Sequence, residues 1–199
     1  MTRNEILEKL RDAFPGKPLE ADPDNSDGIR IPSPELPEVA AFLKTEPSLD
    51  FNYLFFISAI DRLEFLETSV RPELRACRAV EGQDVDRLKA LEVLYHLYSM
   101  GKGHHIIIKT RLDRKNPVLD SVTALWPAAN WHEREVYDLF GVRFDGHPDL
   151  RRILLPEDWE GHPMLRDFIH PNLIRRPDSP AEVSSEDAPK ESGRRVPAP

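Results

Sequence analysis

The spacing of hydrophobic residues at the start of the chain predicts an amphipathic helix. Ile6, Leu7 and Leu10 fall on one helical face. Thr2 and Glu5 have the three-residue spacing of a capping box, so we expect the helix to begin there and to run through residue 14. The next segment, residues 15–27, is polar and interrupted by proline and glycine, which predicts a linker.

The pattern over residues 29–60 predicts a strand, then a helix, then a second strand. Residues 29–31 predict a short edge strand that ends at Pro32. Ser33 is expected to cap a helix over residues 34–45, with proline at its first position. Residues 51–60 are rich in aromatic and aliphatic side chains, which predicts a buried strand.

The middle of the chain predicts a β-hairpin. Residues 61–90 carry mixed charges and show no clear period. Residues 91–100 and 104–112 both favour strands, and the glycine-rich turn at 101–103 joins them as antiparallel neighbours. A short helix is expected over residues 121–126, where it stops before a proline.

A second capping pattern predicts a helix that begins at Asn130 and ends at Gly141. Asn130 and Glu133 have the spacing of a capping box, and glycine readily adopts the left-handed conformation that closes a helix. The charged residues Glu133, Arg134 and Asp138 are expected off the apolar stripe, with Arg134 and Asp138 in reach of an ion pair. The stripe itself consists of Val136, Leu139 and Phe140.

The helical period disappears after Gly141. The segments GHPDLRR (146–152) and GHPMLRD (161–167) repeat the same breaker residues fifteen positions apart. Several large apolar side chains lie in and between them, which argues against disorder. We therefore predict a well-ordered irregular segment that lays apolar residues and arginines onto another surface.

These elements together predict an α+β fold, in which helices pack on a mostly antiparallel sheet. A long ordered irregular C-terminal segment and a disordered tail are expected to follow. The tail is rich in proline and has no aromatic residue. The expected parts are an N-terminal helix (1–14), a linker (15–27), an α+β core (28–142), a docking extension (143–174) and the disordered tail (175–199).

Composition excludes several function classes. The net charge of −8 and the pI near 5.4 argue against nucleic acids and anionic lipid heads as partners. No apolar run approaches the roughly 20 residues of a membrane helix, and acidic residues near the start argue against a secretory signal or a transit peptide. Cys77 is the only cysteine, so the chain holds no disulfide and no four-thiolate iron–sulfur cluster.

Histidines and acids leave other chemistry open. His104 and His105 are neighbours on a strand, so only one of them can share a face with His96. Glu133 and Glu135 diverge by roughly 200° around a helix, which disfavours a paired acid and base. A metal site remains an alternative, with ligands drawn from His132, Glu133, Glu135, His147 and His162.

The motifs around this helix resemble one protein family. Glu133-Arg134-Glu135, Asp138, His147, Arg151 and the Ile153-Leu154 pair are similar to the pattern of the thirty-kilodalton subunit family of respiratory complex I, which in bacteria is the C subunit of NADH-quinone oxidoreductase. PEDWEGHP (156–163) also looks like this family, and the resemblance extends more loosely through residues 95–112. Residues 164–167 depart somewhat from it.

The resemblance implies a non-catalytic subunit in the peripheral arm of the proton-translocating NADH:quinone oxidoreductase. It would be held on the cytoplasmic side of the bacterial inner membrane, against the large quinone-site subunit and iron–sulfur subunits. This chain would carry no cofactor, since FMN and iron–sulfur clusters are expected in the partners. The expected signature and interface residues are Glu133, Arg134, Glu135, Tyr137, Asp138, His147, Arg151, Arg152, Trp159 and His162.

Two other interpretations stay open. A related membrane-bound hydrogenase-type complex uses an equivalent subunit. The histidines and glutamates could instead belong to a stand-alone metal-dependent enzyme.

Overall fold

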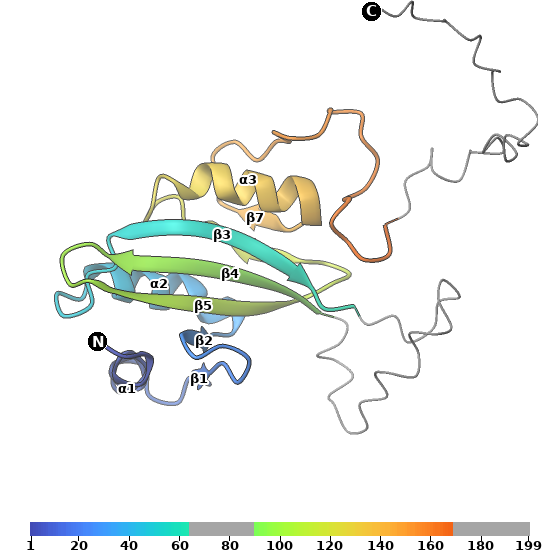
Figure 1. Cartoon of the computed structure of the whole chain (residues 1–199). Helices are drawn as coiled ribbons and strands as arrows, with labels where there is room; N and C mark the ends of the chain where they lie inside the picture. The colour runs from blue at the N-terminus through green and yellow to red at the C-terminus, as the bar shows by residue number, and fades with distance from the viewer. Residues whose placement is uncertain (64–89, 169–199) are drawn as a thin grey trace, which may run out of the picture. The chain divides into compact units, whose positions relative to one another are not determined.

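The computed structural model describes residues 1–63 and 90–168, and everything below concerns these two ranges. Cys77, most of the unassigned stretch 61–90 and the expected tail 175–199 lie outside them. Figure 1 shows the described part as a sheet with one helix behind it and the other two along its opposite edges.

Helix α1 (Arg3–Ala13) forms as its sequence predicts. The Thr2 side chain accepts a hydrogen bond from Glu5 N, and the Glu5 side chain accepts one from Thr2 N, so the capping box is confirmed. The three predicted face residues Ile6, Leu7 and Leu10 are all buried.

Helix α2 (Leu36–Thr45) begins later than predicted. Ser33–Glu35 instead form a separate 3-10 turn, and no side chain caps either element. The cause is a second proline. Pro37 would lie inside a helix that began at residue 34, where its missing N–H and its ring disrupt helical bonding. In the observed arrangement, both Pro34 and Pro37 lie in first turns, which tolerate proline.

The main sheet has the strand order β1-β2-β5-β4-β3. Strand β1 (Glu20–Ala21) lies within the segment predicted to be a linker, and it pairs antiparallel with β2 (Gly28–Arg30). The prediction that β2 is an edge strand was wrong, because β2 also pairs in parallel with β5. The turn that folds β1 back onto β2 is held by the hydrogen bond from Asp22 N to Gly28 O, at 2.8 Å.

The predicted hairpin is confirmed as β4 (Ala90–Ser99) and β5 (His104–Asp113), paired in one continuous register. Strand β3 (Tyr53–Asp61) pairs antiparallel with β4 and lies at the edge of the sheet. It was predicted to be buried, yet part of the strand faces away from the core. Tyr53 and Phe55 are 47% and 57% exposed.

A small second sheet joins distant parts of the chain. Strand β6 (Val118–Asp120) pairs in parallel with β7 (Arg143–Asp145), which follows helix α3 (Ala129–Phe140). The short helix predicted over residues 121–126 was wrong, since this stretch forms hydrogen-bonded turns. A residue far away in the sequence holds these turns in place, because Trp126 Nε1 donates a hydrogen bond to Phe51 O at 3.0 Å.

The core lies between one face of the sheet and the helices. Leu36, Ala40 and Leu43 of α2 meet Tyr95 and Leu97 of β4 around a cavity of only about 10 Å³. Helix α3 packs along β3 (Figure 1). The predicted α+β class with a mostly antiparallel sheet is confirmed. No helix in the described ranges is long and apolar enough to cross a membrane.

The capping box gives a direct test of the N-terminal helix. We expect Thr2→Ala to lower the free energy of unfolding by about 1 kcal/mol, because Glu5 N loses its side-chain acceptor in the first turn. Thr45→Ala, at the exposed end of α2, is the matched control and should change stability by less than about 0.5 kcal/mol. Urea denaturation measures both. Equal effects would show that the box does not stabilise the fold.

Candidate functional site

The site begins at the first turn of α3, where the predicted cap is absent. Asn130 lies inside the helix, which starts at Ala129 without a side-chain cap. Glu133 does not reach back to Asn130. Its carboxylate accepts from Val122 N at 2.8 Å and from Ser121 Oγ at 2.7 Å, so it fixes the preceding turn. The capping-box prediction was therefore wrong.

Glu133 is fully buried, and no ion pair of its carboxylate is found among the described residues. Burial raises the pKa of Glu133 to about 7, and the hydrogen bonds from Ser121 and Val122 offset only part of that rise. Glu135 lies exposed on another side of α3, so the predicted divergence of the two acids is confirmed.

Asp138 is the centre of the site. Its fully buried carboxylate pairs with Arg152 Nη1 at 2.7 Å. Its other oxygen accepts from three successive backbone N–H groups, those of Ile153, Leu154 and Leu155, at 2.8–3.0 Å. Successive N–H groups that converge in this way form an anion-binding nest. The expected pair of Asp138 with Arg134 is absent, because the carboxylate turns toward the extension.

The charge state of Asp138 follows from these contacts. Burial alone would raise the pKa of its carboxyl, but the hydrogen bonds from the nest and from Arg152 outweigh burial and lower the pKa below its ordinary value. Asp138 therefore stays ionised. A buried carboxylate is stable only when its oxygens are satisfied, so the loop at 153–155 is held in one conformation.

Arg152 extends the network along the irregular segment. Besides the Asp138 side chain, its guanidinium donates to Asp138 O at 3.2 Å, to Trp159 O at 3.0 Å and to Gly161 O at 3.1 Å. One side chain thus joins the end of α3 to two separate turns. The fixed fork of donors in arginine suits this role better than lysine would.

The two Gly-His-Pro units have the same structural role. His147 Nδ1 accepts from Asp149 N, so Nε2 carries the proton and donates to Asn130 O at 3.2 Å. His162 Nδ1 donates to Asp138 O at 2.9 Å. The glycine before each histidine has a positive φ, 80° and 81°. The repeat therefore attaches the extension to both ends of α3.

Arg134 attaches α3 to a point of the extension that lies between the two Gly-His-Pro units. Its Nε donates to Arg151 O at 3.2 Å, and its guanidinium lies 5.0 Å from the ring centre of Trp131. Arg134 and Asp138 are both buried, although a simple amphipathic pattern would expose them. They were predicted to lie off the apolar stripe, and they are buried because the extension covers a second side of α3.

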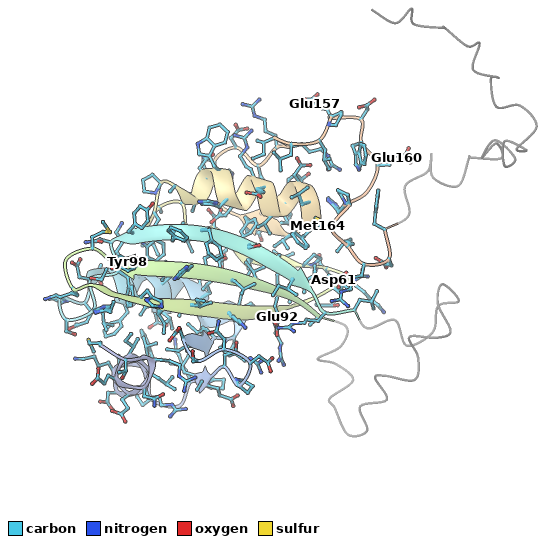
Figure 2. The ribbon with its side chains drawn as sticks, viewed as in Figure 1. Asp61, Glu92, Tyr98, Glu157, Glu160 and Met164 are labelled. Carbon is cyan, nitrogen blue, oxygen red and sulfur yellow. The ribbon has the colours of Figure 1, made fainter. Side chains whose placement is uncertain are left out.

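A second buried carboxylate, which no sequence motif indicated, holds the far end of the extension. Asp61, at the end of β3, accepts hydrogen bonds from Arg114 and one from Arg166 N at 2.8 Å. Arg114 also pairs with Asp167. Burial favours a higher pKa for Asp61, but Arg114 and the backbone donors lower it. Figure 2 labels Asp61 at this end of the sheet.

The predicted signature residues thus divide by exposure. Glu133, Arg134 and Asp138 are buried and serve the fold of this chain. Glu135 and Arg151 are exposed. The half-buried remainder lies between the helix and the extension: Tyr137, His147, Arg152, Trp159 and His162.

The geometry does not assemble the alternative metal site. Within residues 1–63 and 90–168, no three histidine, cysteine, aspartate or glutamate side chains lie close enough to hold a metal ion. His104 and His105 point to opposite faces as predicted. His104 is buried with its Nε2 2.8 Å from Leu49 O, whereas the His105 ring lies 5.4 Å from His96.

Comparison with known proteins identifies the family. Residues 29–172 match the family described as "Respiratory-chain NADH dehydrogenase, 30 Kd subunit". The chain belongs to this family. The match covers the sheet from β2 onward, α3 and the whole described extension.

Relatives in the 30 kDa subunit family agree. The chain is 38% identical over 163 residues to the C subunit of NADH-quinone oxidoreductase from Roseiflexus sp. (strain RS-1), across 81% of each protein. It is also 37% identical over 149 residues to the C/D subunit of NADH-quinone oxidoreductase from Methylococcus capsulatus, across 73% of this chain and 22% of that protein.

Two solved structures share the fold. The trypsin-resistant fragment (1-134) of Nqo5 is 31% identical, with a TM-score of 0.53, and the match covers 75% of this chain and 100% of the fragment. A chain of the membrane-bound sulfane sulfur reductase, an archaeal respiratory membrane complex, has a TM-score of 0.58 across 86% of this chain and 88% of that chain. At 22% identity, the second shows the fold alone.

The Asp138 nest can be tested against an exposed aspartate nearby. We expect Asp138→Asn to lower the free energy of unfolding by about 3–5 kcal/mol, because Arg152 loses its buried partner and the nest loses its charge. Asp149→Asn removes only an exposed pair with Arg151 and should cost about 0.5 kcal/mol or less. Trypsin should cut after Arg152 in the first variant under conditions that leave this bond intact in the wild type. Similar stability of both variants would contradict the role of the nest.

The contribution of the Glu133 carboxyl to the free energy of unfolding is expected to fall as pH rises. The folded chain binds its proton more tightly than the unfolded chain, with a pKa of about 7 against 4.5. This contribution is complete below pH 4.5 and is lost as pH rises to about 7. The free energy of unfolding of wild type minus Glu133→Gln should fall by about 3 kcal/mol over this interval.

The pKa values of Asp22, Asp61, Glu92 and Asp138 are lowered, so these groups make the free energy of unfolding rise with pH. Because the wild type and Glu133→Gln share these groups, their contributions cancel in the difference. Glu135→Gln, at an exposed neighbour on α3, is the control and should change the free energy of unfolding by less than about 0.5 kcal/mol. A flat difference for Glu133→Gln would show that this carboxyl titrates normally.

Proposed function

We propose that this chain is a non-catalytic subunit of the peripheral arm of complex I, the proton-translocating NADH:quinone oxidoreductase. Its role is to position the large quinone-site subunit and its iron–sulfur neighbours. Electrons pass in those partners from NADH through FMN and iron–sulfur clusters to quinone. This chain holds no cofactor and is kept on the cytoplasmic side of the bacterial inner membrane through the complex.

The observation that carries the proposal is the preorganised extension. Residues 143–168 are irregular after β7, yet Asp138 and Asp61 hold them at two separate points. Their inward groups are engaged with α3, which leaves other side chains free to face a partner. Leu154 and Met164 are 58% and 54% exposed, and Arg151 is exposed near Leu154 in sequence. A rigid loop with exposed apolar and arginine side chains loses little entropy on binding.

A two-part relative supports the identity of the neighbour. The protein from Methylococcus capsulatus is named as a C/D subunit, and this chain aligns with 22% of its length. Two components can be joined in one chain only where their positions in the assembly allow it. We therefore assign the exposed side of the extension to the large quinone-site partner, which corresponds to the D part of that protein.

A hydrogenase-type complex and a stand-alone metal enzyme are less well supported. The relatives that match over most of the chain are named for NADH-quinone oxidoreductase. Among the described residues, Glu133, His147 and His162 each already bind a group of this chain, which leaves no convergent set of ligands.

Two exposed arginines test this assignment. Arg151 and Arg143 each pair with an aspartate two residues away, at 2.9 and 3.0 Å, and are 67% and 60% exposed. We expect Arg151→Glu to reduce the amount of assembled complex at least about tenfold, because it places a carboxylate inside the interface. Arg143→Glu, the matched control on β7, should assemble normally. Native gels of solubilised membranes measure both.

The isolated variants should unfold within about 0.5 kcal/mol of the wild type, since both arginines are exposed. Full assembly with Arg151→Glu would contradict the assignment of the extension as the interface. Recovery of the tagged wild-type chain from native membranes without flavin or iron would contradict membership in the complex.

A further inference from the structure

The face of the sheet that points away from the core is the strongest feature that the proposed function does not use. In Figure 1 the described helices lie behind or beside the sheet, whereas β3, β4 and β5 turn their other face to the viewer. Along β4, His96 and Tyr98 lie on this outer face and are only half-buried, while Tyr95 and Leu97 are buried in the core. Figure 2 labels Tyr98 and Glu92 toward the two ends of this face.

A β-bulge in β3 places an additional ring on the outer face. Leu54 pairs with Leu97 and Phe56 with His96, so Phe55 is an extra residue without a partner in the register. In a regular strand, Phe55 and Phe56 would point to opposite faces. The bulge redirects Phe55 outward, where its ring lies 5.7 Å from that of Phe56 and is 57% exposed.

The rings form a continuous ladder across three strands. Both phenylalanine rings lie 5.3 Å from His96, and His96 lies 5.4 Å from His105 on β5. Tyr53 and Tyr98 extend the ladder, each at 6.4 Å from a neighbouring ring. We call these six residues the aromatic ladder: Tyr53, Phe55, Phe56, His96, Tyr98 and His105. Exposed aromatic side chains that gather in this way are typical of binding surfaces.

Positive charge follows the ladder along the same face. Glu92 is fully buried and accepts from Arg62 at 2.8 Å and from Arg111 at 2.9 Å. Among the residues that the structure describes, one carboxylate therefore faces two guanidinium groups, which leaves a net positive charge. The two arginine side chains are 32% and 34% exposed, so part of each guanidinium-bearing side chain is open to a partner. A carboxylate from outside would complete this cluster.

We propose that the aromatic ladder and the Arg62–Arg111 pair form a second docking surface, which binds an amphipathic segment of another subunit. That segment presents apolar side chains to the ladder and a carboxylate to the arginine pair. The partner is specified by charge complementarity, because the described residues of the cluster beside the ladder carry two guanidinium groups and one carboxylate. This surface is separate from the extension and goes beyond the proposed function, although it rests on the chain acting within an assembly.

Site-specific photocrosslinking in the assembled complex tests the proposal. Benzoylphenylalanine replaces Phe55 in the full chain, and in parallel it replaces Leu154 on the extension and Glu8 on the exposed side of α1. After irradiation of native membranes, mass spectrometry sequences the crosslinked peptides. Position 55 should capture one segment of a partner protein in which apolar residues lie next to aspartate or glutamate, and position 8 should capture none.

Several results would overturn the docking surface. A crosslink from position 154 without one from position 55 refutes it and leaves the proposed function standing. A crosslink from position 55 to a basic segment, or to a second copy of this chain, refutes the stated partner. No crosslink from either position 55 or position 154 contradicts the proposed function as well.

The contribution of the Phe55 ring to binding is tested with benzoylphenylalanine at position 53. Phe55→Ser should lower the yield of the same crosslinked peptide at least about fivefold, because it removes an exposed ring that packs on the partner. Phe55→Leu keeps an apolar side chain of similar size and should retain most of the yield. Since Phe55 is exposed, neither change should prevent folding, and equal yields in all three proteins would refute the role of the ladder.

Discussion

The extension depends on one constraint, which is that the buried carboxylate of Asp138 must have all its acceptor positions satisfied. A charge out of contact with water is costly unless donors surround it. Arg152 and three successive backbone N–H groups supply these donors, and all of them belong to the segment after α3. The conformation of an otherwise irregular loop is thus set by a single helical side chain.

The same principle recurs wherever the described chain buries an ionised acid. Asp61 gathers Arg114 and the backbone of residue 166, Glu92 lies between two arginines, and Asp22 pairs with Arg30 and Lys109. Glu133 differs, because its carboxylate accepts hydrogen bonds from Ser121 and Val122 but has no ion pair among the described residues. Burial therefore raises its pKa to about 7. Paired acids fix distant segments, whereas Glu133 joins α3 to the turn before it.

Two surfaces of different character result. The extension is irregular, and contacts with Asp138 and Asp61 hold it in place, while Arg151, Leu154 and Met164 are exposed on it. On the outer face of the sheet, a bulge adds Phe55 to a ladder of rings beside the Arg62–Arg111 pair.

Local sequence patterns were sufficient to predict the elements with a strong signal of their own: the capping box of α1, the β4–β5 hairpin, the end of α3 at Gly141 and the motifs that identify the family. The start of α3, the central place of β2, the edge position of β3 and the burial of Arg134 and Asp138 emerged only in the tertiary structure. A local pattern shows which residues share a helical face. It cannot show that a segment fourteen or more residues later returns to cover a second face of the same helix.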